Sequence, residues 1–178
     1  MRSRSSSWAR CVCAAALATA VAARAEDAGP SGISNVRIEN ERAAAAVRRA
    51  LVGAHERLKD RACGAVLQRF QDADGHTLQE NLEATGQSPE SYLRTYVFFY
   101  EGYRLPTCRS RRAKKGLAVT WPGSRAVYVC TTRFTDMEKR SPVMAQAIVI
   151  HEMLHTLGLG ENPPSNFEIT ERVRARCR

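Results

Sequence analysis

Two stretches of the chain have a hydrophobic pattern that is typical of a helix. In residues 40–59 apolar residues recur every three or four positions with arginines between them, so we expect an amphipathic helix that packs on a sheet. Residues 143–150 are apolar on nearly every face, which predicts a buried helix. Ser141 can cap that helix and Pro142 suits its first turn, where no backbone N–H is needed.

Shorter apolar runs predict the strands. Residues 65–70 alternate in polarity and predict a short strand, and residues 95–100 (TYVFFY) predict a strand that is buried on both faces. Residues 117–121 and 126–130 flank a Pro-Gly-Ser turn, which predicts a hairpin. Residues 131–140 are interpreted as a polar connector that leads to the buried helix.

The remaining segments predict short helices and turns. Residues 72–75 are expected to form a plain turn, which we favour over a calcium-binding loop. Residues 78–84 and a segment that starts at Ser88 should be helical. Ser165 and Glu168 form a capping-box pattern that opens a last helix, which ends near residue 176. Together the elements predict an α+β fold: a small, mostly antiparallel sheet that packs against an N-terminal helix and a buried helix, with a C-terminal helix.

The N-terminal composition predicts an exported protein. Residues 1–25 combine arginines without acids, a short apolar run and a small-x-small cleavage pattern, which is typical of a signal peptide and too short for a membrane span. Residues 26–39 are expected to be a flexible leader and residues 40–178 a single domain. Cleavage would remove four arginines and no acid, so the formal net charge falls from +9 to +5. We therefore expect a secreted or periplasmic protein that has no membrane span in its mature form and no need of nucleic acid.

Four cysteines remain after the predicted cleavage. An even number in an exported domain indicates two disulfides, with three connectivities open. We favour Cys108–Cys130, which would tie a loop to a strand end, and Cys63–Cys177, which would fasten the C-terminal helix to the N-terminal half. A cysteine zinc site is disfavoured because none of the four forms a CxxC pair.

The main chemical signal is the sequence His151-Glu152-Met153-Leu154-His155. Residues four apart lie on one face of a helix, so both imidazoles can point at one metal ion. Glu152 can then reach a water molecule at that ion, which is the HExxH arrangement of zinc peptidases. The alternative is a buried helix whose two histidines are satisfied by other partners. Because burial of these side chains is costly without a partner, we favour a Zn²⁺ site.

The longer run HEMLHTLGLGE resembles the metzincin branch of the zincin-type zinc metallopeptidases. The resemblance implies a zincin-like fold in which His151 and His155 are zinc ligands, Glu152 is the general base, Gly158 turns the chain and Glu161 is the third ligand. The sequence departs from that family in two ways: the third ligand is usually His or Asp, and the methionine turn is absent. The run HEMLHTLGLGENPPS is also similar to small secreted bacterial proteins of metallopeptidase type.

Some roles stay open at the level of the sequence. A second zincin branch takes its third ligand from a later helix, so Glu168, Glu171 and also His76 remain alternatives to Glu161. A side chain that stabilises the oxyanion could come from Tyr100, Tyr103 or Tyr128.

The sequence thus predicts a secreted zinc metalloendopeptidase. The resemblance implies that a protein or peptide substrate binds in an extended conformation, paired with an edge strand from residues 117–121 or 126–130. Two alternatives are a non-catalytic, zinc-stabilised binding domain of the cell envelope and an interaction module that uses the basic loop 109–115.

Overall fold

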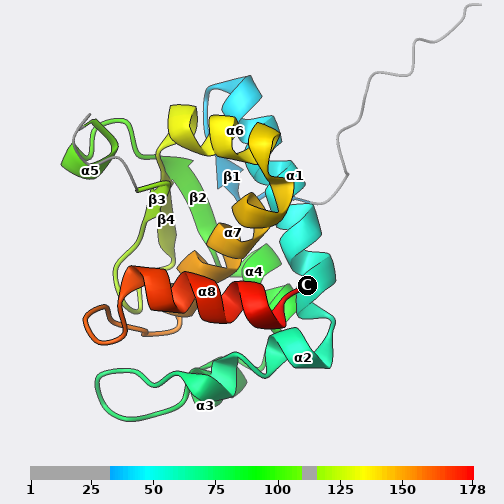
Figure 1. The fold of residues 1–178 in the computed structure, drawn as a ribbon, viewed down its shortest axis with the longest axis vertical. Coiled ribbons are helices and arrows are strands. Elements are labelled where there is room, and N and C mark those ends of the chain that lie inside the picture. Colours follow the sequence, from blue (N-terminus) through cyan, green and yellow to red (C-terminus); the bar gives the residue numbers. More distant parts are fainter. Residues whose placement is uncertain (1–32, 110–115) are drawn as a thin grey trace, which may run out of the picture.

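The computed structural model describes residues 33–109 and 116–178, in which a small sheet is combined with helices (Figure 1). It is therefore a mixed α+β fold, as predicted. The elements in chain order are β1 (Val36–Arg37), α1 (Glu41–Leu58), α2 (Arg61–Gly64), η1 (Leu67–Arg69), α3 (Leu78–Glu83), α4 (Pro89–Thr95), β2 (Phe98–Glu101), α5 (Pro106–Arg109), β3 (Ala118–Val119), β4 (Ala126–Val129), α6 (Thr131–Arg140), α7 (Pro142–Thr156) and α8 (Asn166–Arg176).

The sheet has the strand order β1-β2-β4-β3, and the pairings β1–β2 and β2–β4 are parallel. Only β3 and β4, the predicted hairpin, are antiparallel. The prediction of a mostly antiparallel sheet is therefore wrong. The reason is that the chain leaves β2 for the edge position of β3 and returns in β4 between them, so β4 runs in the same direction as β2. Helices α1 to α4 form the crossover that parallel β1 and β2 require.

Helix α1 packs chiefly on other helices. Asn40 caps it, as its side chain accepts a hydrogen bond from Ala43 N–H at 3.0 Å, and the buried face that includes Val47 and Leu51 packs against α6 and α7. The expectation that this face packs on a sheet is thus only marginally met, through β1. The core lies between the helices and one face of the sheet, which contributes Phe99 and Val127.

Two predicted segments have a different structure. Residues 65–70 follow α2 and contain the 3₁₀ helix η1 instead of a strand, and residues 131–140 form α6 instead of a connector. In α6 the buried residues Phe134, Thr135 and Glu138 have helical spacing, but two of the three are polar, so hydrophobicity alone does not reveal the face. In 65–70 the run is too short for alternation to exclude a helical turn.

Strands β1 and β2 also differ from the predictions. Strand β2 begins at Phe98, three residues later than expected, because α4 extends to Thr95. Phe98 and Tyr100 are half-buried and only one face of this strand packs on the core. Within the expected leader 26–39, residues 33–39 are described, and they contain β1, which pairs with β2. These residues belong to the folded domain because Val36 and Ile38 are buried.

The structure contains the two favoured disulfides, Cys63–Cys177 and Cys108–Cys130. Such bonds form in oxidising compartments, so they are compatible with an extracellular protein. Among the described residues no helix has the length and apolarity that crossing a membrane requires. The predicted signal peptide 1–25 and the rest of the leader lie outside the described residues, as do residues 110–115 of the basic loop.

Candidate metal centre

The last turns of α7 carry the HExxH residues into the interior. The helix starts as predicted, with Pro142 in its first turn and the Ser141 side chain as the cap. His151, Glu152 and His155 are 1%, 5% and 4% exposed, respectively. Burial of three ionisable side chains in one helix costs free energy unless they find partners. Their surroundings therefore decide what the site can do.

The two histidines direct their Nε2 atoms at each other. His151 Nε2 lies 3.0 Å from His155 Nε2, and His155 Nε2 lies 3.3 Å from Glu161 Oε1. One ligand atom from each of the three side chains can be chosen so that all lie within 4.8 Å of one another. Two nitrogens bound tetrahedrally to one zinc ion at 2.0–2.1 Å would be about 3.3 Å apart. The spacing therefore fits a shared metal ion.

The outer partners of the imidazoles fix their tautomers. His155 Nδ1 lies 2.7 Å from the carbonyl oxygen of Leu159, which can only accept, so Nδ1 carries the proton. The Thr170 hydroxyl donates its proton to the Asn166 carbonyl at 3.0 Å, so it accepts from His151 Nδ1 at 3.0 Å. In both rings the facing Nε2 is then an unprotonated acceptor. Such outer partners are typical of metal-binding histidines.

A proton is a poor substitute for a metal between these nitrogens. Burial and, to a smaller extent, the nearby His155 together lower the pKa of His151 to about 3. An imidazolium at this position is thus disfavoured at neutral pH, although two facing acceptors and the Glu161 carboxylate need a positive charge. A divalent cation satisfies all three, and imidazole with carboxylate is a donor set that zinc accepts.

Glu152 lies in the same buried region but has no comparable partner. Among the described residues it forms no hydrogen bond or ion pair, and burial together with the Glu161 charge raises its pKa to about 8. A carboxyl group held without a partner is costly, and a strongly shifted pKa in such a place is typical of a functional group. Glu152 thus differs from the three candidate ligands, each of which has a described partner.

A tight turn brings Glu161 back to the histidines. Gly158 has φ of 108°, and a Cβ there would lie 3.1 Å from the Asp72 Cβ, so both conformation and space require glycine. Asn81 donates from its side chain to the Leu157 carbonyl at 2.9 Å and to Asp72 at 2.8 Å, which holds the turn. The role of Gly158 that the resemblance implied is compatible with this geometry.

The other candidate ligands have partners elsewhere. Glu168 pairs with Arg172 and Glu171 with Arg174, and the capping box is only half formed because the Glu168 side chain turns away from Ser165. His76 lies close to Asp72 and Asp74. These three residues belong to an exposed turn before α3. Of the residues that the structure describes, Glu161 alone joins the two histidines.

The candidate tyrosines are not tied to the centre by a described contact. Tyr100 and Tyr128 contact each other at a ring distance of 5.8 Å, and Tyr103 contacts Arg104. Sequence reasoning missed Thr170 and the Leu159 carbonyl. A threonine in the middle of a helix and a backbone oxygen give no chemical signature in the sequence, so only the three-dimensional arrangement reveals them.

No protein-family model, curated protein or solved structure matches this chain.

Proposed function

We propose that the protein is a secreted zinc-dependent endopeptidase. The observation that supports this best is the pair of unprotonated Nε2 atoms that face each other at 3.0 Å, with the Glu161 carboxylate 3.3 Å away. In the mechanism, His151, His155 and Glu161 would hold the ion and leave one position open for water or substrate. A zinc ion in such a site supplies a Lewis acid that polarises a carbonyl group and acidifies water.

Glu152 is the proposed general base. A cation held beside Glu152 would favour its ionised form, and this carboxylate takes a proton from the water whose oxygen attacks the scissile carbonyl carbon. Glu152 then gives this proton to the amide nitrogen as the C–N bond breaks, so the products are a carboxylate and an amine. A structural metal site gains nothing from a buried carboxylate without a partner, and this favours catalysis over the alternative of a zinc-stabilised binding domain.

Strand β3 is the proposed docking edge for the substrate. It lies at an edge of the sheet and, in the part of the chain that the structure describes, pairs with β4 alone, so its other edge can hydrogen-bond an extended peptide. The loop after β3 is joined to the site, because Gly123 N–H donates to the His155 carbonyl at 2.9 Å. Of the two strands considered from the sequence, β4 lies inside the sheet, which leaves β3.

The test combines metal content with peptide cleavage. We expect purified protein to contain about one zinc per chain and to cleave a casein-type substrate, with activity lost on chelation and restored by zinc. Glu152→Gln should retain zinc and lose at least about 10²-fold in kcat, since a general base contributes at least this much. Glu161→Gln should lose zinc. Glu171→Gln, a carboxylate of similar exposure that pairs with Arg174, is the matched control and should change neither property.

The outcomes separate the alternatives. Bound zinc without cleavage of any casein-type substrate would favour the zinc-stabilised binding domain. Glu152→Gln with unchanged kcat would show that another group is the base. Metal-free protein, even after addition of zinc, would overturn the proposal.

A further inference from the structure

The metal centre is supported from outside by helix α8. Thr170 on this helix holds His151 through Nδ1, as described above, and Asn166 one turn earlier donates from its side-chain amide to Glu161 Oε1 at 3.2 Å. Thr170 is itself oriented by the Asn166 carbonyl. Two of the three candidate ligands thus receive their outer hydrogen bonds from one face of α8, near its N-terminus.

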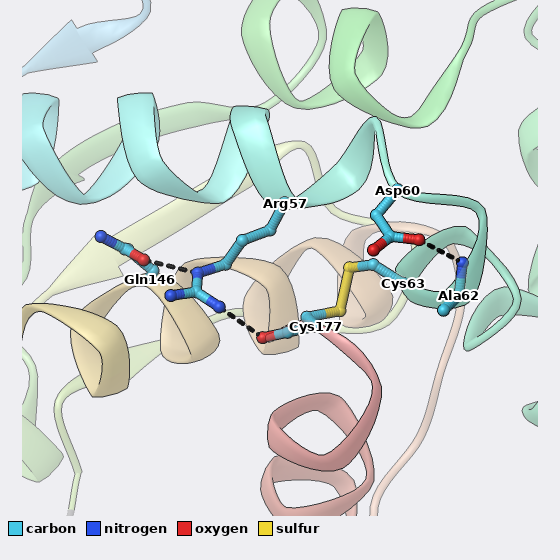
Figure 2. Close-up of a disulfide and its surroundings, with 6 residues drawn as sticks. All are labelled: Arg57, Asp60, Ala62, Cys63, Gln146 and Cys177. Atoms are coloured by element: carbon cyan, nitrogen blue, oxygen red, sulfur yellow. Dashed lines mark hydrogen bonds between the residues drawn. A yellow bond between two sulfur atoms is a disulfide. The ribbon is translucent and has the colours of Figure 1, made fainter.

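The other end of α8 is covalently fixed. Figure 2 shows Cys177, directly after the helix, joined to Cys63 of α2 by a disulfide. Beside it, Arg57 of α1 donates to the Cys177 carbonyl at 2.7 Å and to Gln146 of α7 at 2.6 Å. The arginine therefore ties α1, α7 and the end of α8 together, next to the disulfide that joins α8 to α2.

Toward its N-terminus, α8 is held by packing and by the preceding loop, without a disulfide. The helix follows the loop 157–165 and packs on α7 through buried Ile169 and Val173. Besides the disulfide, this packing, the loop, the Arg57–Cys177 hydrogen bond and the contact of Arg172 with the Phe70 ring help to fix how far Thr170 stands from His151. The Thr170–His151 hydrogen bond at 3.0 Å would be lost once its two atoms stood about 3.6 Å apart, so the metal site depends on the position of α8.

We infer that α8 is a positioning element for the metal centre, in which Thr170 orients His151 and the Cys63–Cys177 disulfide keeps Thr170 in place. The inference rests on the proposed zinc centre. In metal sites, the outer partner of a histidine fixes its tautomer and orientation, and its loss typically costs 10–100-fold in metal affinity. Thr170 is not catalytic, because it acts only through His151.

The first test measures zinc affinity by competition with a chromophoric chelator. Thr170→Val keeps the shape of the side chain but cannot accept the Nδ1 proton, so we expect the Kd for Zn²⁺ to rise 10–100-fold. Thr170→Ser keeps the hydroxyl and should therefore have a Kd close to that of wild type, without the 10–100-fold rise expected for Thr170→Val. The visible spectrum of bound Co²⁺ should change in Thr170→Val and not in Thr170→Ser. A change in folding alone would not separate the two variants in this way.

The second test asks whether the disulfide acts through Thr170. Removal of Cys63–Cys177 by a double alanine variant should raise the Kd for Zn²⁺, whereas removal of Cys108–Cys130, which does not contact α8, should leave it unchanged. In the Thr170→Val background the loss of Cys63–Cys177 should have a smaller effect on the Kd than in wild type, because effects that share one contact are not additive.

These measurements separate the inference from the proposed function. If wild type binds zinc and Thr170→Val binds it with an unchanged Kd, the role of α8 is wrong while the zinc centre stands. Additive effects of Thr170→Val and the disulfide variant would overturn the link between them. If wild type binds no zinc, both fail. The Thr170 test does not depend on the disulfide variant being folded.

Discussion

Two buried glutamates show how the partner of a residue decides its role. The side chain of Glu138 on α6 is 8% exposed and accepts two hydrogen bonds from Arg49, at 2.8 and 2.7 Å. These bonds to Arg49 lower the pKa of Glu138. Glu152 on the next helix is buried to a similar extent without such a cation, and its pKa is raised. The first carboxylate stabilises the fold, and the second is suited to exchange a proton.

The Arg49–Glu138 pair predicts a pH-dependent contribution to stability. Since the folded-state pKa of Glu138 is lowered below the unfolded value of 4.5, the contribution is present above pH 4.5 and is lost as pH falls through the folded pKa. We expect Arg49→Met to lower the free energy of unfolding by about 1–2 kcal/mol at pH 7, a modest value because Arg49 is half exposed. Urea unfolding at several pH values measures it.

The adjacent arginine provides the control. Arg48 pairs with Glu41 at 3.6 Å, and the Glu41 side chain is 84% exposed, so Arg48→Met should cost no more than about 0.5 kcal/mol. If the loss in Arg49→Met does not shrink as pH is lowered below about 4.5, which is the unfolded-state pKa of a glutamate, the assignment to Glu138 is wrong.

At the scale of elements, local signals in the sequence predict well where their chemistry is explicit. Ser141 and Pro142 predict the start of α7 and Ser88 that of α4, and both caps form in the structure. Helix α6 escapes prediction because its buried face includes Thr135 and Glu138, whose burial depends on the distant Arg49. The parallel sheet escapes because the order of strands depends on long-range contacts.

For the candidate metal centre too, the sequence predicts the local features but not those that depend on long-range contacts. The spacing of His151, Glu152 and His155 predicts that they share a helix end, and the tight turn at Gly158 explains how Glu161 returns to them. The sequence favours Glu161 as the third ligand but does not exclude the glutamates of α8. The choice depends on where α8 lies, and this is fixed by packing and a disulfide far along the chain.

The turn after α7 predicts a sharp contrast between two glycines. Gly158→Ala should destabilise the protein by about 1–3 kcal/mol, because alanine disfavours a φ of 108° and its Cβ would press on Asp72. It should also weaken zinc binding, since the turn positions both the Leu159 carbonyl and Glu161. Gly160→Ala is the control: a Cβ there meets nothing within 4 Å, and the change should stay within about 0.5 kcal/mol. Equal effects in urea unfolding would contradict this reading of the turn.

At the scale of the whole molecule, the N- and C-terminal parts of the described chain are fastened to each other. Helix α1 packs on α6 and α7, and Arg57 links it to both α7 and the last residues. Cys63–Cys177 spans 114 residues and encloses most of the described chain, whereas Cys108–Cys130 spans 22 residues beside the sheet. Helix α7, which carries the candidate metal ligands His151 and His155, lies inside the larger loop, so its surroundings depend on that closure.

The two disulfides should therefore differ in what they contribute to stability. A crosslink restricts the unfolded chain more when it closes a longer loop, which gives about 5 kcal/mol for Cys63–Cys177 and about 3 kcal/mol for Cys108–Cys130. In metal-free protein, we expect the Cys63→Ala, Cys177→Ala double variant to lose more free energy of unfolding than the Cys108→Ala, Cys130→Ala variant. Denaturant unfolding in the presence of a chelator separates this effect from that of bound metal. The reverse order would mean that native contacts around Cys108–Cys130, and not the length of the closed loop, govern the stability of this fold.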